Sequence, residues 1–281
     1  MRRRQRILFV LICLLLSHPG LTLAASPTVA VSIKPVHSLV AGVMHGVGVP
    51  ALIVKGSRSP HSYNLKPSDA RTLAAADVIV WIGPSLEMFL EKPLSALSGH
   101  SRIVTLLEGT SGDPHLWLAP ALAATIVERV TTALSQVDPA NGPTYARNAQ
   151  ALKTRLKALQ VEGIVSLTPV RETPFLVFHD AWGHFAQAFG LSVAGAVAIN
   201  PERVAGAKRI ATIRRLIDDS GARCLFREPQ FLSPLLATVL EDHESIRVFE
   251  LDPLGSALQA GPDLYFKMMG ANIEAVRACL Q

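Results

Sequence analysis

One long helical pattern near the middle of the chain constrains the fold most. Five apolar residues between positions 143 and 168 recur at steps of four and three: Tyr145, Ala149, Leu152, Leu156 and Leu159. This spacing places them on one face of an α-helix. Pro143 suits the first turn of that helix, and Pro169 blocks its continuation. A helix of this length spans roughly 30 to 38 Å, so it can connect two lobes stiffly.

Short β-rich segments alternate with helical patterns on both sides of this helix. The expected strands cover residues 28–33, 51–54, 78–82 and 103–106, then 175–178, 191–197, 223–226 and 246–251. The expected helices cover residues 36–44, 67–76, 85–97 and 120–136, then 181–189, 204–219, 232–242 and 263–280. Nearly continuous apolar strands that alternate with helices are typical of parallel sheets covered on both faces.

The sequence therefore predicts an α/β fold with two lobes. An N-terminal α/β lobe covers residues 25–142, a rigid linker helix covers 143–168, and a C-terminal α/β lobe covers 169–281. Each lobe is expected to contain a four-stranded parallel sheet flanked by helices.

The first residues have the pattern of an export signal. Four arginines precede an apolar run over residues 7–16, and small residues follow around Ala24 and Ala25. This pattern predicts a secretory signal peptide over residues 1–24, removed after Ala24 or Ala25. Without those four arginines the formal net charge falls from +5 to +1, so nothing in the charge supports nucleic-acid binding. We therefore expect a protein that works outside the cytoplasm.

Two cysteines remain after this cleavage, Cys224 and Cys279. In an oxidising compartment they can pair only with each other. Two buried free thiols are the alternative.

Three histidines and one aspartate lie where ligands usually bind in such a fold. His61, His115, His179 and Asp252 follow the second, fourth, fifth and eighth expected strands. Ligands of parallel α/β sheets bind beyond the carboxyl ends of the strands. Three imidazoles with a carboxylate or a water suit the tetrahedral shell of Zn²⁺. The sequence thus predicts a metal site, and binding should weaken below about pH 6.5, where imidazole takes up a proton.

Other polar residues are expected to have other roles. The remaining histidines of the mature chain are expected to cap, to lie at the surface or to pack in the core: His37, His45, His100, His184 and His243. Glu228 follows the seventh expected strand, and a structural ion pair is favoured over a place beside the metal. The sequence contains no G-x-S-x-G, Walker-type or H-E-x-x-H motif, so it does not indicate an enzyme.

Seven stretches carry a resemblance to a known family. They are SIKPVHSL (32–39), PHSYNLKPSD (60–69), GPSLE (83–87), PHLWLAP (114–120), FHDAW (178–182), REPQF (227–231) and LDPLG (251–255). The chain resembles the metal-binding periplasmic components of ABC importers, in particular their zinc-uptake branch.

The resemblance implies two α/β lobes bridged by one helix, with metal held in the cleft by His61, His115 and His179. Asp252 matches a position that supplies a fourth ligand in some members, and water does so in others; we expect Asp252 to be a supporting ligand. The late cysteine pair resembles the disulfide of the zinc branch. The implied partners are an inner-membrane ABC permease with its cytoplasmic ATPase, and a metal-donating periplasmic protein is a further candidate. We expect a monomer.

Two departures from the family pattern concern how metal is acquired. The stretch before the second ligand, residues 106–113, reads LLEGTSGD and has no histidine, whereas members of the zinc branch often carry a long histidine-rich loop there. Pro60 stands before the first ligand, where some members have an acidic residue.

Several functions compete at this stage. The leading hypothesis is capture of Zn²⁺ for import, because three neutral imidazoles suit zinc better than Mn²⁺, which prefers more oxygen ligands. A manganese-importing component is the first alternative. A zinc-dependent hydrolase is another, since three histidines and a water also form catalytic sites. An extracellular adhesion or scaffold protein is the last.

Overall fold

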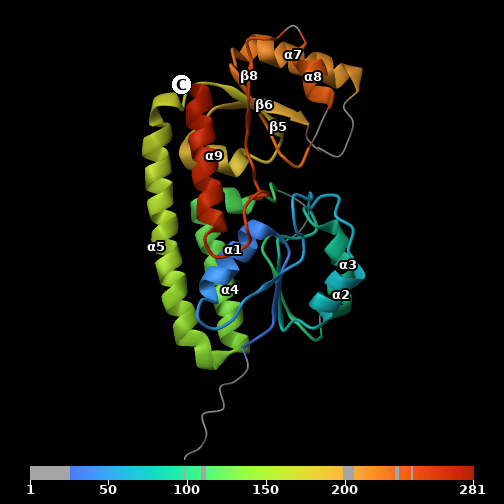
Figure 1. The fold of residues 1–281 in the computed structure, drawn as a ribbon, viewed down its shortest axis with the longest axis vertical. Helices are drawn as coiled ribbons and strands as arrows, with labels where there is room; N and C mark the ends of the chain where they lie inside the picture. Colours follow the sequence, from blue (N-terminus) through green and yellow to red (C-terminus); the bar gives the residue numbers. More distant parts are fainter. Residues whose placement is uncertain (1–25, 98, 109–111, 199–205, 232–233, 242) are drawn as a thin grey trace, which may run out of the picture.

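The computed structural model describes residues 26–281, apart from residues 98, 109–111, 199–205, 232–233 and 242. The expected signal peptide lies outside the described residues. Two lobes are stacked along one long helix, α5 (Gly142–Leu167), which runs down one side of the molecule (Figure 1). None of the helices in the described ranges is both long enough and apolar enough to cross a membrane.

The N-terminal lobe is built on a four-stranded parallel sheet with the order β2-β1-β3-β4. Its strands are β1 (Val29–Val31), β2 (Ala51–Leu52), β3 (Val78–Trp81) and β4 (Arg102–Thr105), and its helices are α1 (Lys34–Val43), α2 (Pro67–Ala74), α3 (Met88–Leu97) and α4 (Pro120–Val137). Alternate strand residues point to opposite faces. Val78 and Val80 pack against α1 and α4, whereas Ile79 and Trp81 pack against α2 and α3.

The C-terminal lobe repeats this topology, with the parallel order β6-β5-β7-β8. Its strands are β5 (Phe175–His179), β6 (Val193–Ala198), β7 (Cys224–Arg227) and β8 (Arg247–Glu250), and its helices are α6 (Gly183–Phe189), α7 (Ala207–Ser220), α8 (Pro234–Leu240) and α9 (Leu264–Leu280). Three short 3₁₀ turns complete the described fold: η1 (Leu116–Leu118), η2 (Pro139–Asn141) and η3 (Thr168–Val170). The predicted fold class is confirmed, although β8 is largely exposed, because it is an edge strand with α-helical cover on only part of its surface.

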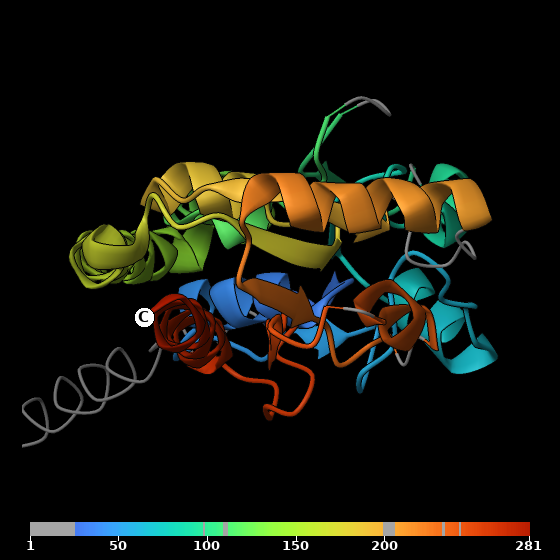
Figure 2. The same ribbon diagram turned by 90° about the horizontal axis from the view of Figure 1, so that it is seen from above.

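The linker helix buries the apolar face that its sequence predicts. Tyr145, Ala149, Leu152 and Leu156 are buried, and Leu159 packs partly buried against the same core. α9 packs along α5 and also against α1 of the other lobe, and both long helices are seen end-on in Figure 2. The two lobes therefore share one continuous core across the linker helix.

A loop from the C-terminal lobe is also fixed to the N-terminal lobe. We call residues 252–263 the interlobe loop. The buried ammonium group of Lys34 donates hydrogen bonds to three carbonyl oxygens of this loop, those of Gly255, Ser256 and Leu258, at 3.3, 2.8 and 3.1 Å. The indole of Trp117 donates to the Pro253 carbonyl at 2.6 Å, and the Ser38 hydroxyl donates to the Pro262 carbonyl at 3.0 Å.

These contacts predict that the lobes move little relative to each other when metal binds. Hinge closure uses a few loop residues that absorb large backbone changes, and a continuous helix with an anchored interlobe loop does not provide them. Small-angle scattering curves of the metal-free and zinc-loaded protein should nearly superimpose. A marked fall in the radius of gyration on loading would contradict this prediction.

Cys224 on β7 and Cys279 on α9 form a disulfide across a sequence separation of 55 residues. The expected pairing is confirmed, and the alternative of two free thiols is wrong. Because the link restricts the unfolded chain, Cys224→Ser with Cys279→Ser should lower the free energy of unfolding by about 4 kcal/mol. Urea denaturation with and without reductant measures this, since reductant should destabilise the wild type and leave the double variant unchanged. A wild type that is insensitive to reductant would contradict the prediction.

Candidate metal centre

The fold brings three of the four predicted metal ligands together between the lobes. His61 lies on the loop between β2 and α2, His115 precedes η1, and His179 ends β5. In the C-terminal sheet, β6 lies on one side of β5 and β7 lies on the other, so the strand order reverses between β5 and β7. Ligands of parallel α/β sheets typically bind at such a switch point, beyond the carboxyl ends of the strands. Two imidazoles thus come from the N-terminal lobe and one from the C-terminal lobe.

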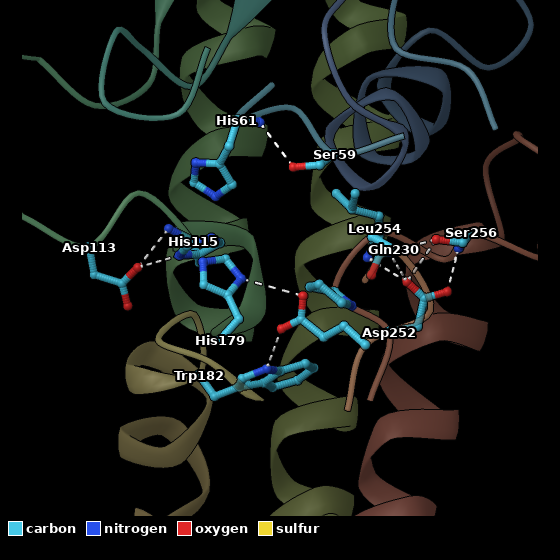
Figure 3. Close-up of polar contacts among 12 residues, drawn as sticks. Ser59, His61, Asp113, His115, His179, Trp182, Gln230, Asp252, Leu254 and Ser256 are labelled. Carbon is cyan, nitrogen blue, oxygen red and sulfur yellow. Dashed lines mark hydrogen bonds and ion pairs between the residues drawn. The ribbon is translucent and has the colours of Figure 1, made fainter. Parts of the chain in front are cut away.

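The three imidazole rings face one another (Figure 3). One ring nitrogen of each lies within 4.8 Å of the others, and this is the only such group that could hold a metal among the described residues. The ring centroids are 5.6, 5.1 and 5.0 Å apart for His61 with His115, His61 with His179 and His115 with His179. His115 and His179 are buried, whereas His61 is partly exposed.

Two carboxylates determine which nitrogen of each buried ring is free. Asp113 Oδ1 lies 2.7 Å from His115 Nδ1, and Glu228 Oε2 lies 3.4 Å from His179 Nδ1. An ionised carboxylate only accepts hydrogen bonds, so each Nδ1 carries the proton and each Nε2 keeps a free lone pair. His61 Nε2 is buried without a hydrogen-bond partner. This pattern matches metal-binding histidines, whose other nitrogen usually donates to a carboxylate.

The surroundings of the site favour neutral imidazoles. Burial, followed by repulsion from His115 and His179, lowers the pKa of His61 to about 3. Burial also lowers the pKa of His115, although the hydrogen bond to Asp113 opposes this. Burial alone would raise the pKa of Asp113, but its hydrogen bond to His115 holds that pKa below the usual value. The lowered pKa values keep His61 and His115 neutral, and so able to bind a cation, at lower pH than a free imidazole.

The same shift predicts how stability depends on pH. Between pH 6.5 and about 3, unfolded His61 is protonated while folded His61 is neutral, so the stability that His61 contributes is present above pH 6.5 and is lost as the pH falls. Urea unfolding of metal-free protein at pH 7 and pH 5 should show a loss up to about 2 kcal/mol larger in the wild type than in His61→Gln. Glu87, whose pKa burial raises to about 7, acts in the opposite direction but is common to both proteins. Equal losses in the two proteins would contradict the assigned shift.

Asp252 lies apart from the three rings, with Gln230, Leu254 and Ser256 (Figure 3). Its Oδ1 accepts hydrogen bonds from Gln230 Nε2 at 2.8 Å and from the Leu254 backbone N–H at 3.0 Å. Its Oδ2 accepts from the Ser256 backbone N–H. Its role as a supporting ligand stays a prediction, and coordination would require some of these hydrogen bonds to be given up.

Three other residues around the site have structural roles that the sequence did not specify. Glu228 is buried beside His179 and accepts a hydrogen bond from the indole of Trp182 at 3.0 Å, so it lies beside the candidate site and not in an ion pair with a lysine or arginine among the described residues. Asp113 was not predicted, although its place two residues before His115 allows the same carboxylate to bind both the ring and the backbone N–H of His115. Lys34 lies in SIKPVHSL, one of the stretches that carry the family resemblance, but the residues around it in the sequence do not indicate that it contacts the other lobe.

Comparison with known proteins gives a consistent result. A family model described as zinc-uptake complex component A, periplasmic, matches residues 29–279. The high-affinity zinc uptake system protein ZnuA of Brucella abortus (strain 2308) is 36% identical, with 90% of this chain and 91% of that protein covered. ZnuA of Paracoccus denitrificans (strain Pd 1222) is 31% identical, with 92% and 93% covered. A crystal structure of ZnuA has a TM-score of 0.80 and 21% identity, with 91% of this chain and 100% of that chain covered, which supports the fold.

Proposed function

Because the chain belongs to the family of periplasmic zinc-uptake components, we propose that it captures Zn²⁺ outside the cytoplasm and delivers it for import. The observation that carries this proposal is the group of three imidazole nitrogens within 4.8 Å of one another. The family is a solute-binding component of transport systems, and we assign no catalytic step to this chain.

We assign direct coordination to His61, His115 and His179. Zinc–nitrogen bonds of about 2.0 to 2.1 Å in a tetrahedral shell require nitrogen separations of about 3.4 Å. The separations of up to 4.8 Å can reach that value through small side-chain rotations. Neutral nitrogen ligands favour zinc over manganese, which prefers oxygen ligands and a higher coordination number.

Asp252 keeps a supporting role in this proposal. Both of its oxygens accept hydrogen bonds from the chain around them, which disfavours simultaneous coordination of an ion. The fourth position of the zinc shell is then available to a water.

The cellular setting follows from the family. We propose that residues 1–24 direct export and are removed, and that the mature monomer works in the periplasm. Its partner is an inner-membrane ABC permease with a cytoplasmic ATPase, and a metal-donating periplasmic protein would supply it with zinc. The chain divides for this purpose into the proposed lobes 25–142 and 169–281, with residues 143–168 as the linker.

Native mass spectrometry of protein purified from the periplasm without added metal tests the capture of zinc. We expect one zinc ion per chain. A deletion strain should grow poorly on zinc-depleted medium and recover when zinc is added. Purification with bound manganese, together with recovery of the strain on manganese and not on zinc, would overturn the proposal.

A further inference from the structure

The side-chain amide of Gln230 has a fixed orientation beside the candidate metal centre. Its Nε2 donates to Asp252 Oδ1 at 2.8 Å and to Ser256 Oγ at 2.6 Å. The two ends of an amide are hard to distinguish by shape, but a carboxylate accepts hydrogen bonds and cannot donate them. The nitrogen of Gln230 must therefore face Asp252, and the oxygen must face the other way.

That oxygen has no hydrogen-bond partner among the described residues. Gln230 Oε1 is buried, and the Gln230 side chain lines the same pocket as the three histidines. A buried carbonyl oxygen without a donor carries a free-energy cost, so its position is informative.

Three N–H groups of residues that line this pocket already have acceptors. The Nδ1–H groups of His115 and His179 face Asp113 and Glu228, and the indole N–H of Trp117 donates to the Pro253 carbonyl. The free Nε2 atoms of the buried rings are lone-pair acceptors. A donor for Gln230 Oε1 can instead arrive with the cargo, because a water bound to a dication is a strongly polarised donor.

We propose that Gln230 Oε1 accepts a hydrogen bond from the water that completes the zinc shell, and that Asp252 acts by holding the Gln230 amide in this orientation. The inference rests on the proposed function, namely an ion bound by three imidazoles. Gln230 is then a positioning residue for the fourth ligand, and Asp252 contributes to affinity through Gln230 without touching the ion. A neutral acceptor at this place keeps the fourth ligand a water, which adds no anionic oxygen of the kind that manganese prefers.

The first test replaces Gln230 by Met, which has a similar length and no amide. Gln230→Met should still hold one zinc ion per chain in native mass spectrometry, with an affinity about tenfold lower in competition with a chelator, equivalent to about 1.4 kcal/mol. The visible absorption bands of Co²⁺ bound in place of zinc should change, because they report the fourth ligand. His45→Ala is an exposed change outside the lining of this pocket and should leave those bands unchanged. Circular dichroism checks that each variant is folded.

The second test asks whether Asp252 affects zinc affinity by orienting the Gln230 amide or by coordinating the ion directly. Asp252→Asn removes the carboxylate that orients the amide, so it should lower zinc affinity in the wild type. In Gln230→Met protein, Asp252→Asn should lower zinc affinity by less than about twofold, because the amide that Asp252 orients is already absent. A full effect of Asp252→Asn in that background, or unchanged affinity and Co²⁺ bands in Gln230→Met, would overturn this inference. Neither result would contradict the proposed zinc site of three histidines. That proposal would be contradicted if the wild type bound no zinc.

Discussion

Replacing His115 or His179 by Ala should lower zinc affinity by more than about 100-fold. Loss of an outer partner of a ligating histidine alone typically costs about 10 to 100-fold, and loss of the ligand itself should cost at least as much. His61→Ala should have a similar effect, since its Nε2 is buried without a partner in the same group. Isothermal titration in the presence of a competing chelator gives the three affinities.

The structure also decides which histidine makes a clean control. His45 is exposed and its ring contacts no residue of the site, so His45→Ala should bind zinc as the wild type does. His37 is buried, with a ring nitrogen 2.9 Å from the Pro50 carbonyl, and its loss would also affect stability. His184 lies 3.0 Å from the Asp113 carbonyl and is thus close to a partner of the site. Equal losses in His45→Ala and His179→Ala would show that the site has been misplaced.

Wild-type protein should retain zinc in the presence of a large excess of manganese. Asp252→Ala should keep the same preference and lose only part of its zinc affinity, whereas His179→Ala should lose most of it. The physical reason is that the donor set remains three neutral nitrogens when Asp252 is removed. Competition of Zn²⁺ and Mn²⁺ in the wild type and in Asp252→Ala measures both effects. A switch to manganese in Asp252→Ala, or an equal loss of zinc in both variants, would contradict the role assigned to Asp252.

Most of the architecture could be predicted because it depends on local patterns. The spacing of Tyr145, Ala149, Leu152 and Leu156 predicts both the long helix and its buried face, and each is found as predicted. The alternation of strands and helices predicts two parallel sheets. The exposed strand β8 was less predictable, because its sequence does not say that it lies at an edge.

The candidate site could be predicted only in part. Positions at strand ends predict that His61 and His115 lie at one edge of the first sheet and His179 at the corresponding edge of the second, since the carboxyl ends of parallel strands in a sheet share one edge. That these two edges face each other was a separate hypothesis about the linker helix. Their partners depend on contacts between distant segments, such as Glu228 with His179, 49 residues apart. Lys34 reaches carbonyl groups more than 220 residues away, and no local pattern could reveal that.

The unequal exposure of the three imidazoles suggests an order for the exchange of the ion. His115 and His179 are buried and each is held by a carboxylate, whereas His61 is partly exposed and lies on a loop between β2 and α2. With these rings as ligands, we expect the bond to His61 to break first during release and to form last during capture. A partner that displaced this loop would leave only two imidazoles bound to the ion, and unloading would then need no separation of the lobes.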